Sequence, residues 1–244
     1  MKKIIVLMAG LLMIQTVTAQ KLTKKSYSAL LKNKLELAKK YNDSEVFKNT
    51  LYELISIEGE NTPYKDTLAD FYFKTGEYVS FLLLNDERLK RHPGNTDYML
   101  NQAVAYEKIG NLKKAVEYFE KVYAARPDDM KTGFQLAWNQ YQLKRVDETY
   151  RTLMSMKDKP FPEKVFVKIP GVQNKIINVP LKAAYYNLLG LTSYDLHNLD
   201  MAVKYFDEAL KIHPGFESAK QNKAAVEMMK QKLESRPADK DKQK

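Results

Sequence analysis

The sequence predicts an all-α fold in which pairs of helices repeat along the chain. Small residues recur every 34 positions, as at Ala69, Ala103 and Ala137, and Gly76 and Gly110 share that spacing. Each 34-residue window contains two apolar stripes at the i, i+3/i+4, i+7 spacing of an amphipathic helix. Nine glycines in 244 residues are few for an all-β protein. Because one helix pair cannot bury both of its apolar faces, neighbouring pairs are expected to stack into one continuous core.

The first 19 residues have the three parts of a secretory signal. A basic start at Lys2 and Lys3 precedes an uncharged apolar run over 4–14, and Ala19 follows with small or β-branched neighbours. This pattern predicts a cleaved signal peptide over 1–19, with the cut before Gln20. The run is too short for a membrane-spanning helix, which needs about 20 apolar residues. We therefore expect an exported chain without a transmembrane segment, in the periplasm or outside a bacterial cell.

The window 96–129 shows the repeat most clearly. With Thr96 as position 1, small residues stand at positions 8 and 20, where two paired helices would approach closely. A glycine at position 15 would end the first helix, and a proline at position 32 would end the second. The residues at positions 8, 11, 15, 20, 24 and 32 are Ala103, Tyr106, Gly110, Ala115, Phe119 and Pro127.

This pattern resembles the tetratricopeptide repeat. The same frame fits 183–216 well, and it fits three further windows with departures: 62–95, 130–159 and 28–61. The resemblance implies an all-α right-handed superhelix of about five helix pairs within one domain over 20–235.

The carboxyl-terminal part continues the helical pattern beyond the last repeat. Residues 217–235 predict a capping helix, and residues 236–244 form a short charged tail that we expect to be disordered. In the cap, the apolar residues expected to point inward are Ala219, Ala224, Met228 and Leu233.

An insertion over about 158–180 interrupts the period. The distance from Pro127 to Pro214 exceeds two periods by 19 residues, and two β-branched runs over 164–169 and 175–179 predict a β-hairpin or extended loop. One interpretation is that the insertion packs its apolar side on adjacent helices. The other is that it is a partner-contacting arm or a flap over a binding groove, and an exposed hairpin edge could also pair with another strand, including that of a second copy. The contact residues would be Phe166, Ile169 and Ile177.

No motif for catalysis, a cofactor or a metal is present. The chain has no cysteine, which excludes disulfides and thiolate chemistry, and it has no glycine-rich nucleotide loop, HExxH or GxSxG. His92 and His213 share position 31 before a repeat's proline, and His197 takes position 15, so all three are interpreted as turn residues. We expect neither an enzyme nor a cofactor or metal site.

The resemblance implies a concave binding groove lined by positions 2, 5, 9, 12 and 13 of each first helix. These positions include charged residues such as Asp70 and Lys74. Aromatic anchors dominate many binding surfaces, so Trp138, the only tryptophan, is prominent, although it could instead pack on a neighbouring repeat or the insertion. The candidate groove residues are Phe73, Leu100, Val104, Lys131, Phe134, Trp138, Tyr141 and Tyr194.

These features predict a non-enzymatic scaffold that holds a peptide or protein partner in the groove. The alternative is a recognition module for envelope glycan or peptidoglycan, with aromatic rings stacked on sugars. The formal charge of +10 is spread along helix faces, so nucleic acid is not an expected partner. Weak, salt-sensitive association with anionic envelope components is compatible with that charge.

Overall fold

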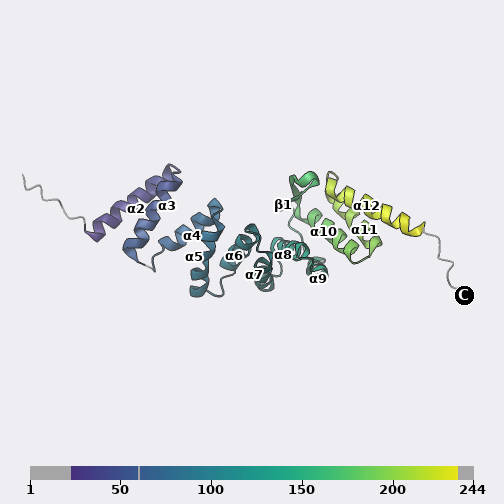
Figure 1. Ribbon diagram of the computed structural model, residues 1–244, viewed down its shortest axis with the longest axis horizontal. Helices are drawn as coiled ribbons and strands as arrows, with labels where there is room; N and C mark the ends of the chain where they lie inside the picture. Colours follow the sequence, from purple (N-terminus) through teal and green to yellow (C-terminus); the bar gives the residue numbers. More distant parts are fainter. Residues whose placement is uncertain (1–22, 60, 236–244) are drawn as a thin grey trace, which may run out of the picture. The chain divides into compact units, whose positions relative to one another are not determined.

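The computed structural model describes residues 23–59 and 61–235. Within them lie eleven α-helices and one two-stranded antiparallel sheet (Figure 1). The predicted signal peptide over 1–19 and the predicted tail over 236–244 lie outside the described residues. The chain divides after Lys74 into two compact units, which are described separately.

The first unit contains helices α2 (Lys24–Lys40), α3 (Ser44–Glu58) and α4 (Tyr64–Thr75, whose last residue lies past the boundary). Helices α2 and α3 pack against each other. The Asp43 side chain begins α3 by accepting a hydrogen bond from the Val46 amide. The two helices bury four leucines, which are Leu31, Leu35, Leu51 and Leu54.

The second unit contains four further helix pairs or parts of pairs, the hairpin and the terminal helix. Its elements are α5 (Tyr78–Arg91), α6 (Thr96–Lys108), α7 (Leu112–Ala125), α8 (Met130–Gln142), α9 (Val146–Met156), β1 (Phe166–Pro170), the short 3-10 helix η1 (Val172–Asn174), β2 (Ile176–Pro180), α10 (Leu181–Asp195), α11 (Leu199–Ile212) and α12 (Glu217–Glu234). The predicted all-α fold of five helix pairs, a hairpin-like insertion and a final helix is confirmed.

The small residues at positions 8 and 20 lie where paired helices meet. Ala103 and Ala115 are fully buried in the α6–α7 pair. In the α10–α11 pair, a Cβ atom built on Gly190 would lie only 2.5 Å from the Phe206 ring, and Phe206 is itself fully buried. Such close approach requires a residue without a large side chain, as the 34-residue pattern predicts.

Every first helix ends at a residue with positive φ at position 15. In two pairs this residue is a glycine, and in three it is a residue with a side chain, including His197 with φ 60°. A left-handed residue is the usual way to end a helix, which confirms the interpretation of His197 as a turn residue. The five residues are Asn42, Gly76, Gly110, Lys144 and His197.

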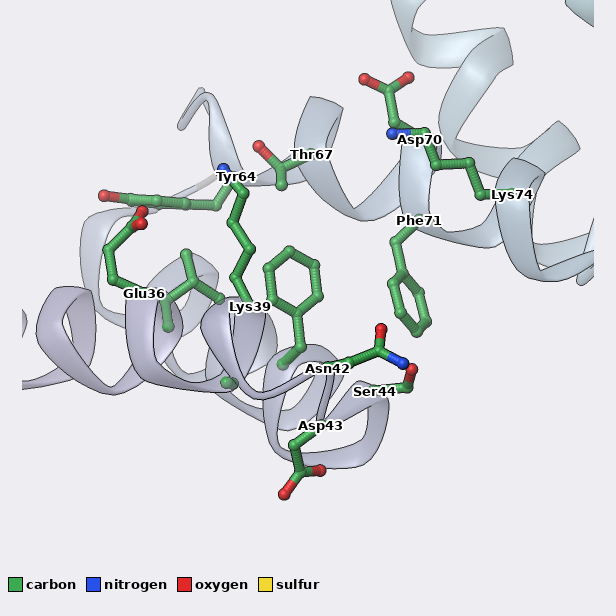
Figure 2. A pocket seen from close by; sticks show the side chains of 13 residues that line it. Glu36, Lys39, Asn42, Asp43, Ser44, Tyr64, Thr67, Asp70, Phe71 and Lys74 are labelled. Carbon is green, nitrogen blue, oxygen red and sulfur yellow. The ribbon is translucent and has the colours of Figure 1, made fainter.

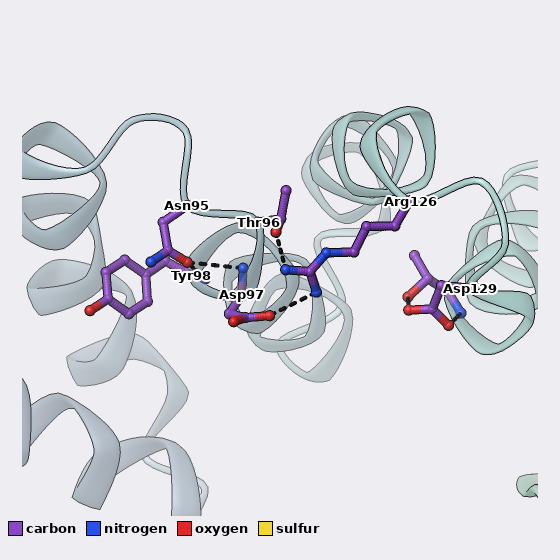
Figure 3. Close-up of polar contacts among 7 residues, drawn as sticks. Asn95, Thr96, Asp97, Tyr98, Arg126 and Asp129 are labelled. Atoms are coloured by element: carbon purple, nitrogen blue, oxygen red, sulfur yellow. Dashed lines mark hydrogen bonds and ion pairs between the residues drawn. The ribbon is translucent and has the colours of Figure 1, made fainter.

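Polar side chains fix the turns between consecutive repeats (Figure 3). Asn95 caps α6, since its side chain accepts hydrogen bonds from two amides of the first turn, and Asp129 caps α8 in the same way. Arg126, just after α7, donates to Asp97 over 2.8 Å and also to the Thr96 hydroxyl. Arg126 thereby connects the carboxyl end of α7 to the amino end of α6, the first helix of the same pair.

The insertion packs its apolar side on the helices. In the hairpin, Val167 pairs with Val179 and Ile169 with Ile177. Three inner side chains, Val167, Ile169 and Val179, are buried in a cluster that also contains Met130 and Phe134 of α8. Ile169 is only 5% exposed, so its expected role as a partner contact is wrong in this structure: the residue supplies core packing. Phe166, by contrast, is 53% exposed.

Helix α12 lies in a different rotation from the one predicted. Ala219 is buried as expected, but Val226 is the other buried residue, while Met228 and Leu233 are exposed. Two turns separate Ala219 from Val226, and Val226 packs against Ala202 and Phe206 of α11. Lys223 lies 2.7 Å from Asp207, and Lys230 pairs with Asp200. The expected inward position of Ala224, Met228 and Leu233 is therefore wrong.

Candidate partner-binding surfaces

The first unit contains a pocket of about 550 Å³ between α2 and α4, closed on one side by the start of α3 (Figure 2). Its floor is apolar. The rings of Phe47 and Phe71 lie 5.5 Å apart at 34°, beside the buried residues Leu35 and Ala38. The remaining lining residues are Glu36, Lys39, Asn42, Asp43, Ser44, Tyr64, Thr67, Asp70 and Lys74.

The rim of this pocket has charges of both signs from both helices. Glu36 and Lys39 come from α2, and Asp70 and Lys74 come from α4 (Figure 2). A pocket with an apolar floor and a few charged groups at its rim has the usual composition of a binding site, since burial of the ligand supplies affinity and the charges fix its orientation.

All four rim residues take positions that the repeat register assigns to the concave groove. Counted from Ser28, Glu36 and Lys39 hold positions 9 and 12, and counted from Thr62, Asp70 and Lys74 hold positions 9 and 13. Sequence reasoning reached the α4 residues but missed Glu36 and Lys39, because 28–61 matches the repeat pattern most weakly. Carrying the register into that window would have found them. Phe73, the predicted groove residue of this unit, is half-buried and does not line the pocket.

In the second unit, the first helices α6, α8 and α10 form what we call the first-helix face. Asn139 of α8 donates to Glu107 of α6 over 3.2 Å, and α8 contacts α10. On α8, the rings of Trp138 and Tyr141 stack with centroids 6.4 Å apart at 29°. Both residues are partly exposed and also pack against the core. Trp138 therefore packs on the core while part of its surface stays accessible, and its role as a groove anchor stays a prediction.

Tyr141 is half-buried at this face, packed against the core. Burial, followed by the nearby Asp195 carboxylate, raises the pKa of Tyr141 well above its ordinary value. The hydroxyl therefore stays protonated at neutral pH and can donate a hydrogen bond. Tyr194, next to Asp195 on α10, is 37% exposed.

The other predicted groove residues are distributed unevenly. Lys131 is exposed, and Leu100 and Val104 are half-buried on α6. Phe134 is only 3% exposed, so its expected role as a surface anchor is wrong. Phe134 belongs to the same buried cluster as Val167, Ile169 and Val179, because the hairpin adds apolar surface that the regular repeat pattern does not contain.

The described part of the chain shows neither a cluster of metal-binding side chains nor a membrane-spanning helix. Within 23–59 and 61–235, no three His, Asp or Glu side chains gather as a metal ion would require. In the same part of the chain, no helix combines the length and the apolar character needed to cross a membrane.

Comparison with known proteins identifies the repeats. Models of the tetratricopeptide repeat match residues 96–129 and 183–216. Among solved structures, MamA is similar at 18% identity with a TM-score of 0.55, covering 67% of this chain and 85% of that one. A MamA fragment from Desulfovibrio magneticus RS-1 is similar at 18% identity with a TM-score of 0.57, covering 78% and 97%. No curated protein matches by sequence.

A third structure comes from a tetratricopeptide repeat protein of Parabacteroides merdae ATCC 43184. It is 14% identical with a TM-score of 0.59, covering 84% of this chain and 74% of that one. The chain thus contains tetratricopeptide repeats and has the fold of a tetratricopeptide-repeat protein. Stacked helical repeats of this kind present extended binding surfaces, and the fold is that of a protein-interaction scaffold.

Proposed function

We propose that this protein is an exported, non-enzymatic scaffold that holds a peptide segment of a protein partner. The observation that carries the proposal is the pocket of the first unit. Four side chains at the concave register positions, Glu36, Lys39, Asp70 and Lys74, line one pocket over the Phe47–Phe71 floor. Asp70 and Lys74 were expected on this surface from the repeat register, and the pocket brings Glu36 and Lys39 of α2 to the same rim.

The chemistry of the pocket favours a peptide of defined character. The aromatic floor takes an apolar side chain, and contact with aromatic rings supplies most of the energy in such sites. The rim of two acidic and two basic side chains, Glu36, Asp70, Lys39 and Lys74, orients charged residues on either side of that anchor. A volume of about 550 Å³ suits one large side chain and its neighbours, because ligand pockets commonly measure about 300–1,000 Å³.

Export is the second part of the proposal and is supported by the sequence alone. The apolar run over 4–14 and the small residues before Gln20 have the form of a signal peptide. Fractionation of cells, followed by mass spectrometry of the amino terminus, tests this part. We expect the mature chain to begin at Gln20 in the envelope or the medium. An intact amino terminus in the cytoplasm would contradict export without affecting the pocket.

A crosslinking pulldown from the native envelope tests the pocket. The test variant is the charge reversal Lys39→Glu/Lys74→Glu at the rim, and the matched control is Lys90→Glu/Lys113→Glu. Lys90 and Lys113 are exposed on the second helices α5 and α7, so the control has the same change in charge. We expect one partner to be captured by the wild type and by the control. We expect the rim variant to retain at most about a tenth of it, a loss of about 1.4 kcal/mol in binding.

If the rim variant retains the partner while Trp138→Ala loses it, the proposal for the pocket is overturned and the first-helix face is the working surface. The Trp138–Tyr141 stack favours one further candidate, a glycan or peptidoglycan ligand, because aromatic rings stack on sugars. Sedimentation of the purified chain with peptidoglycan distinguishes the two. We expect no retention, and retention that Trp138→Ala abolishes would support the glycan candidate instead.

A further inference from the structure

The hairpin of the insertion is the only sheet among the described residues, and it leaves backbone groups unpaired on its two outer edges. Gly171 donates from its amide to the Lys175 carbonyl over 2.8 Å, and Leu181 donates to the Val165 carbonyl over 2.8 Å. Hydrogen-bonded and non-bonded pairs alternate in an antiparallel ladder. The bonded pairs are therefore Val167–Val179 and Ile169–Ile177.

The intervening residues direct their amides and carbonyls away from the partner strand. On β1 these residues are Phe166 and Lys168, and on β2 they are Ile176 and Asn178. Within 23–59 and 61–235 none of these four amides donates to another backbone or side-chain group. An open edge of this kind is a template for a further strand.

The two edges differ in their protection. The β1 edge has Lys168 in its centre and Pro170 at its end, and lysine and proline are the residues that discourage strand pairing. The β2 edge runs Ile176-Ile177-Asn178-Val179 without a charge and, like β1, ends in a proline, Pro180, so the central lysine of β1 is what distinguishes the two edges. Ile176 is 61% exposed. The β2 edge is therefore the one that accepts a strand.

We propose that the β2 edge pairs with the β2 edge of a second copy of this chain, giving a four-stranded antiparallel sheet about a two-fold axis at Asn178. In this register the two Asn178 residues exchange amide-to-carbonyl bonds. The Ile176 amide of each copy falls opposite Pro180 of the other. Pro180 has no amide, and its carbonyl, as the N-cap of α10, accepts the first bond of that helix, so the Asn178 pair supplies the backbone bonds between the copies.

The register also accounts for the exposed apolar side chains of the hairpin. Phe166 pairs with Pro180, and Ile176 pairs with Pro170, within one copy. Across the two-fold axis, Ile176 of one copy falls opposite Pro180 of the other. Phe166 and Ile176, which are 53% and 61% exposed in the single chain, thereby join one apolar row on the outer face of the sheet.

Charge argues against the same arrangement on the other edge. Pairing of two β1 edges about Lys168 would place two like charges directly opposite each other, which destabilises a sheet. Pairing of two β2 edges about Asn178 instead places two amide side chains opposite each other, and these can bond across the strands. A two-fold interface uses one surface twice, so a self-complementary edge suffices to build it.

Cysteine crosslinking tests the proposal, because the chain contains no cysteine of its own. The test variant is Asn178→Cys in residues 20–244, and the matched control is Lys168→Cys, since both side chains are exposed on the outer face of the hairpin. Bonded antiparallel pairs hold their Cα atoms about 5.5 Å apart, within the range of about 4.4–6.8 Å that a disulfide spans. We expect Asn178→Cys to form a disulfide-linked dimer at least about ten times faster than the control, which is governed by random encounter alone.

Sedimentation of the cysteine-free chain supplies the second measurement. We expect a concentration-dependent dimer for the wild type and for Lys168→Pro, and a monomer for Asn178→Pro, which removes an outward amide and leaves the inner ladder intact. Circular dichroism establishes that the variants stay helical. Equal crosslinking rates, a wild-type chain that stays monomeric at every concentration, or a dimer that survives Asn178→Pro would each overturn the proposal. A monomer would leave an extended segment of another protein as the occupant of the edge.

Discussion

The α6–α7 and α10–α11 pairs follow the same repeat pattern but use glycine at different places. The α6–α7 pair has Gly110 at the turn, with φ 79°, and Ala103 at the position where the helices cross. The α10–α11 pair has His197 at the turn, with φ 60°, and Gly190 at the crossing. The first pair has an unstrained turn, whereas the second has a closer crossing, with Phe206 packed against the backbone of α10. The same repeat motif therefore tolerates either an unstrained turn, as in α6–α7, or a left-handed residue with a side chain at the turn together with a closer helix crossing, as in α10–α11.

The largest effect is expected from removing the ring at position 24. Phe206→Ala should lower the free energy of unfolding by about 3–5 kcal/mol, the range for a fully buried phenylalanine. Phe119→Ala, at the equivalent position of the other pair, should cost no more. At Gly190 the cavity is bounded by helix backbone, which collapses less readily than side chains. Denaturant unfolding of both variants measures the difference, and a clearly larger loss for Phe119→Ala would contradict the closer α10–α11 crossing.

The next effect concerns the crossing itself. Gly190→Ala gains about 1 kcal/mol of helix propensity, but its Cβ would lie 2.5 Å from the buried Phe206 ring. Overpacking typically costs about 1–3 kcal/mol, and the contact is severe because both the ring and the backbone are fixed. We therefore expect a net loss of stability of about 1–2 kcal/mol.

A double-mutant cycle separates this contact from other causes. In a Phe206→Leu background the Cβ of Gly190→Ala has more room, and most of the loss should disappear, giving a coupling of about 1 kcal/mol. If the two substitutions are additive, the close approach of the Gly190 backbone to Phe206 is not what limits this position.

Substitutions at the two turns should change the stability of the protein in opposite directions. His197→Gly should stabilise the α10–α11 pair by about 1 kcal/mol, because a side chain in the left-handed region costs about that much. Gly110→Ala should destabilise the α6–α7 pair by a similar amount, since space is available there but φ is positive. Thermal unfolding of both variants checks the pair of signs. A His197→Gly variant that melts lower than the wild type would show that the imidazole makes a compensating contact.

The smallest effect is expected at position 31, where the pairs also differ. Arg126 bonds to Asp97 and Thr96, whereas His213 lies with its ring 6.1 Å from Phe216. Asp97 is 71% exposed and Arg126 is partly exposed, so Arg126→His should cost less than about 1 kcal/mol. The loss should also diminish in high salt, because ions screen exposed pairs. A salt-independent loss would indicate packing by the arginine stem instead.

Much of this fold is predictable because the determining interactions are local. The small residues at positions 8 and 20, the turn at position 15 and the proline at position 32 each act within one helix pair, and the structure places them accordingly. The burial of Phe134 was not predictable, because it depends on the inner side of a hairpin more than 30 residues later in the chain. The rotation of α12 was not predictable either, because it depends on the packing of Val226 against Ala202 and Phe206 of another helix.

The candidate site was predictable only where the repeat pattern is clear. Register assigns Asp70 and Lys74 to the binding surface, but Glu36 and Lys39 stand in the window whose core residues depart furthest from the pattern. Position 8 there is Leu35 and position 20 is Phe47, which are large where the pattern requires small residues. These two large residues help form the apolar part of the pocket, so the departure from the repeat pattern is associated with the proposed binding site.

The most direct test of the proposed scaffold is photocrosslinking in intact cells, with a benzophenone side chain introduced at Lys74 or at Lys113. Lys74 is exposed at the pocket of the first unit, and Lys113 is exposed on the second helix α7. We predict that the probe at Lys74 attaches to the same partner that the pulldown captures, and that the probe at Lys113 does not. Attachment of that partner from Lys113, with none from Lys74, would contradict the account.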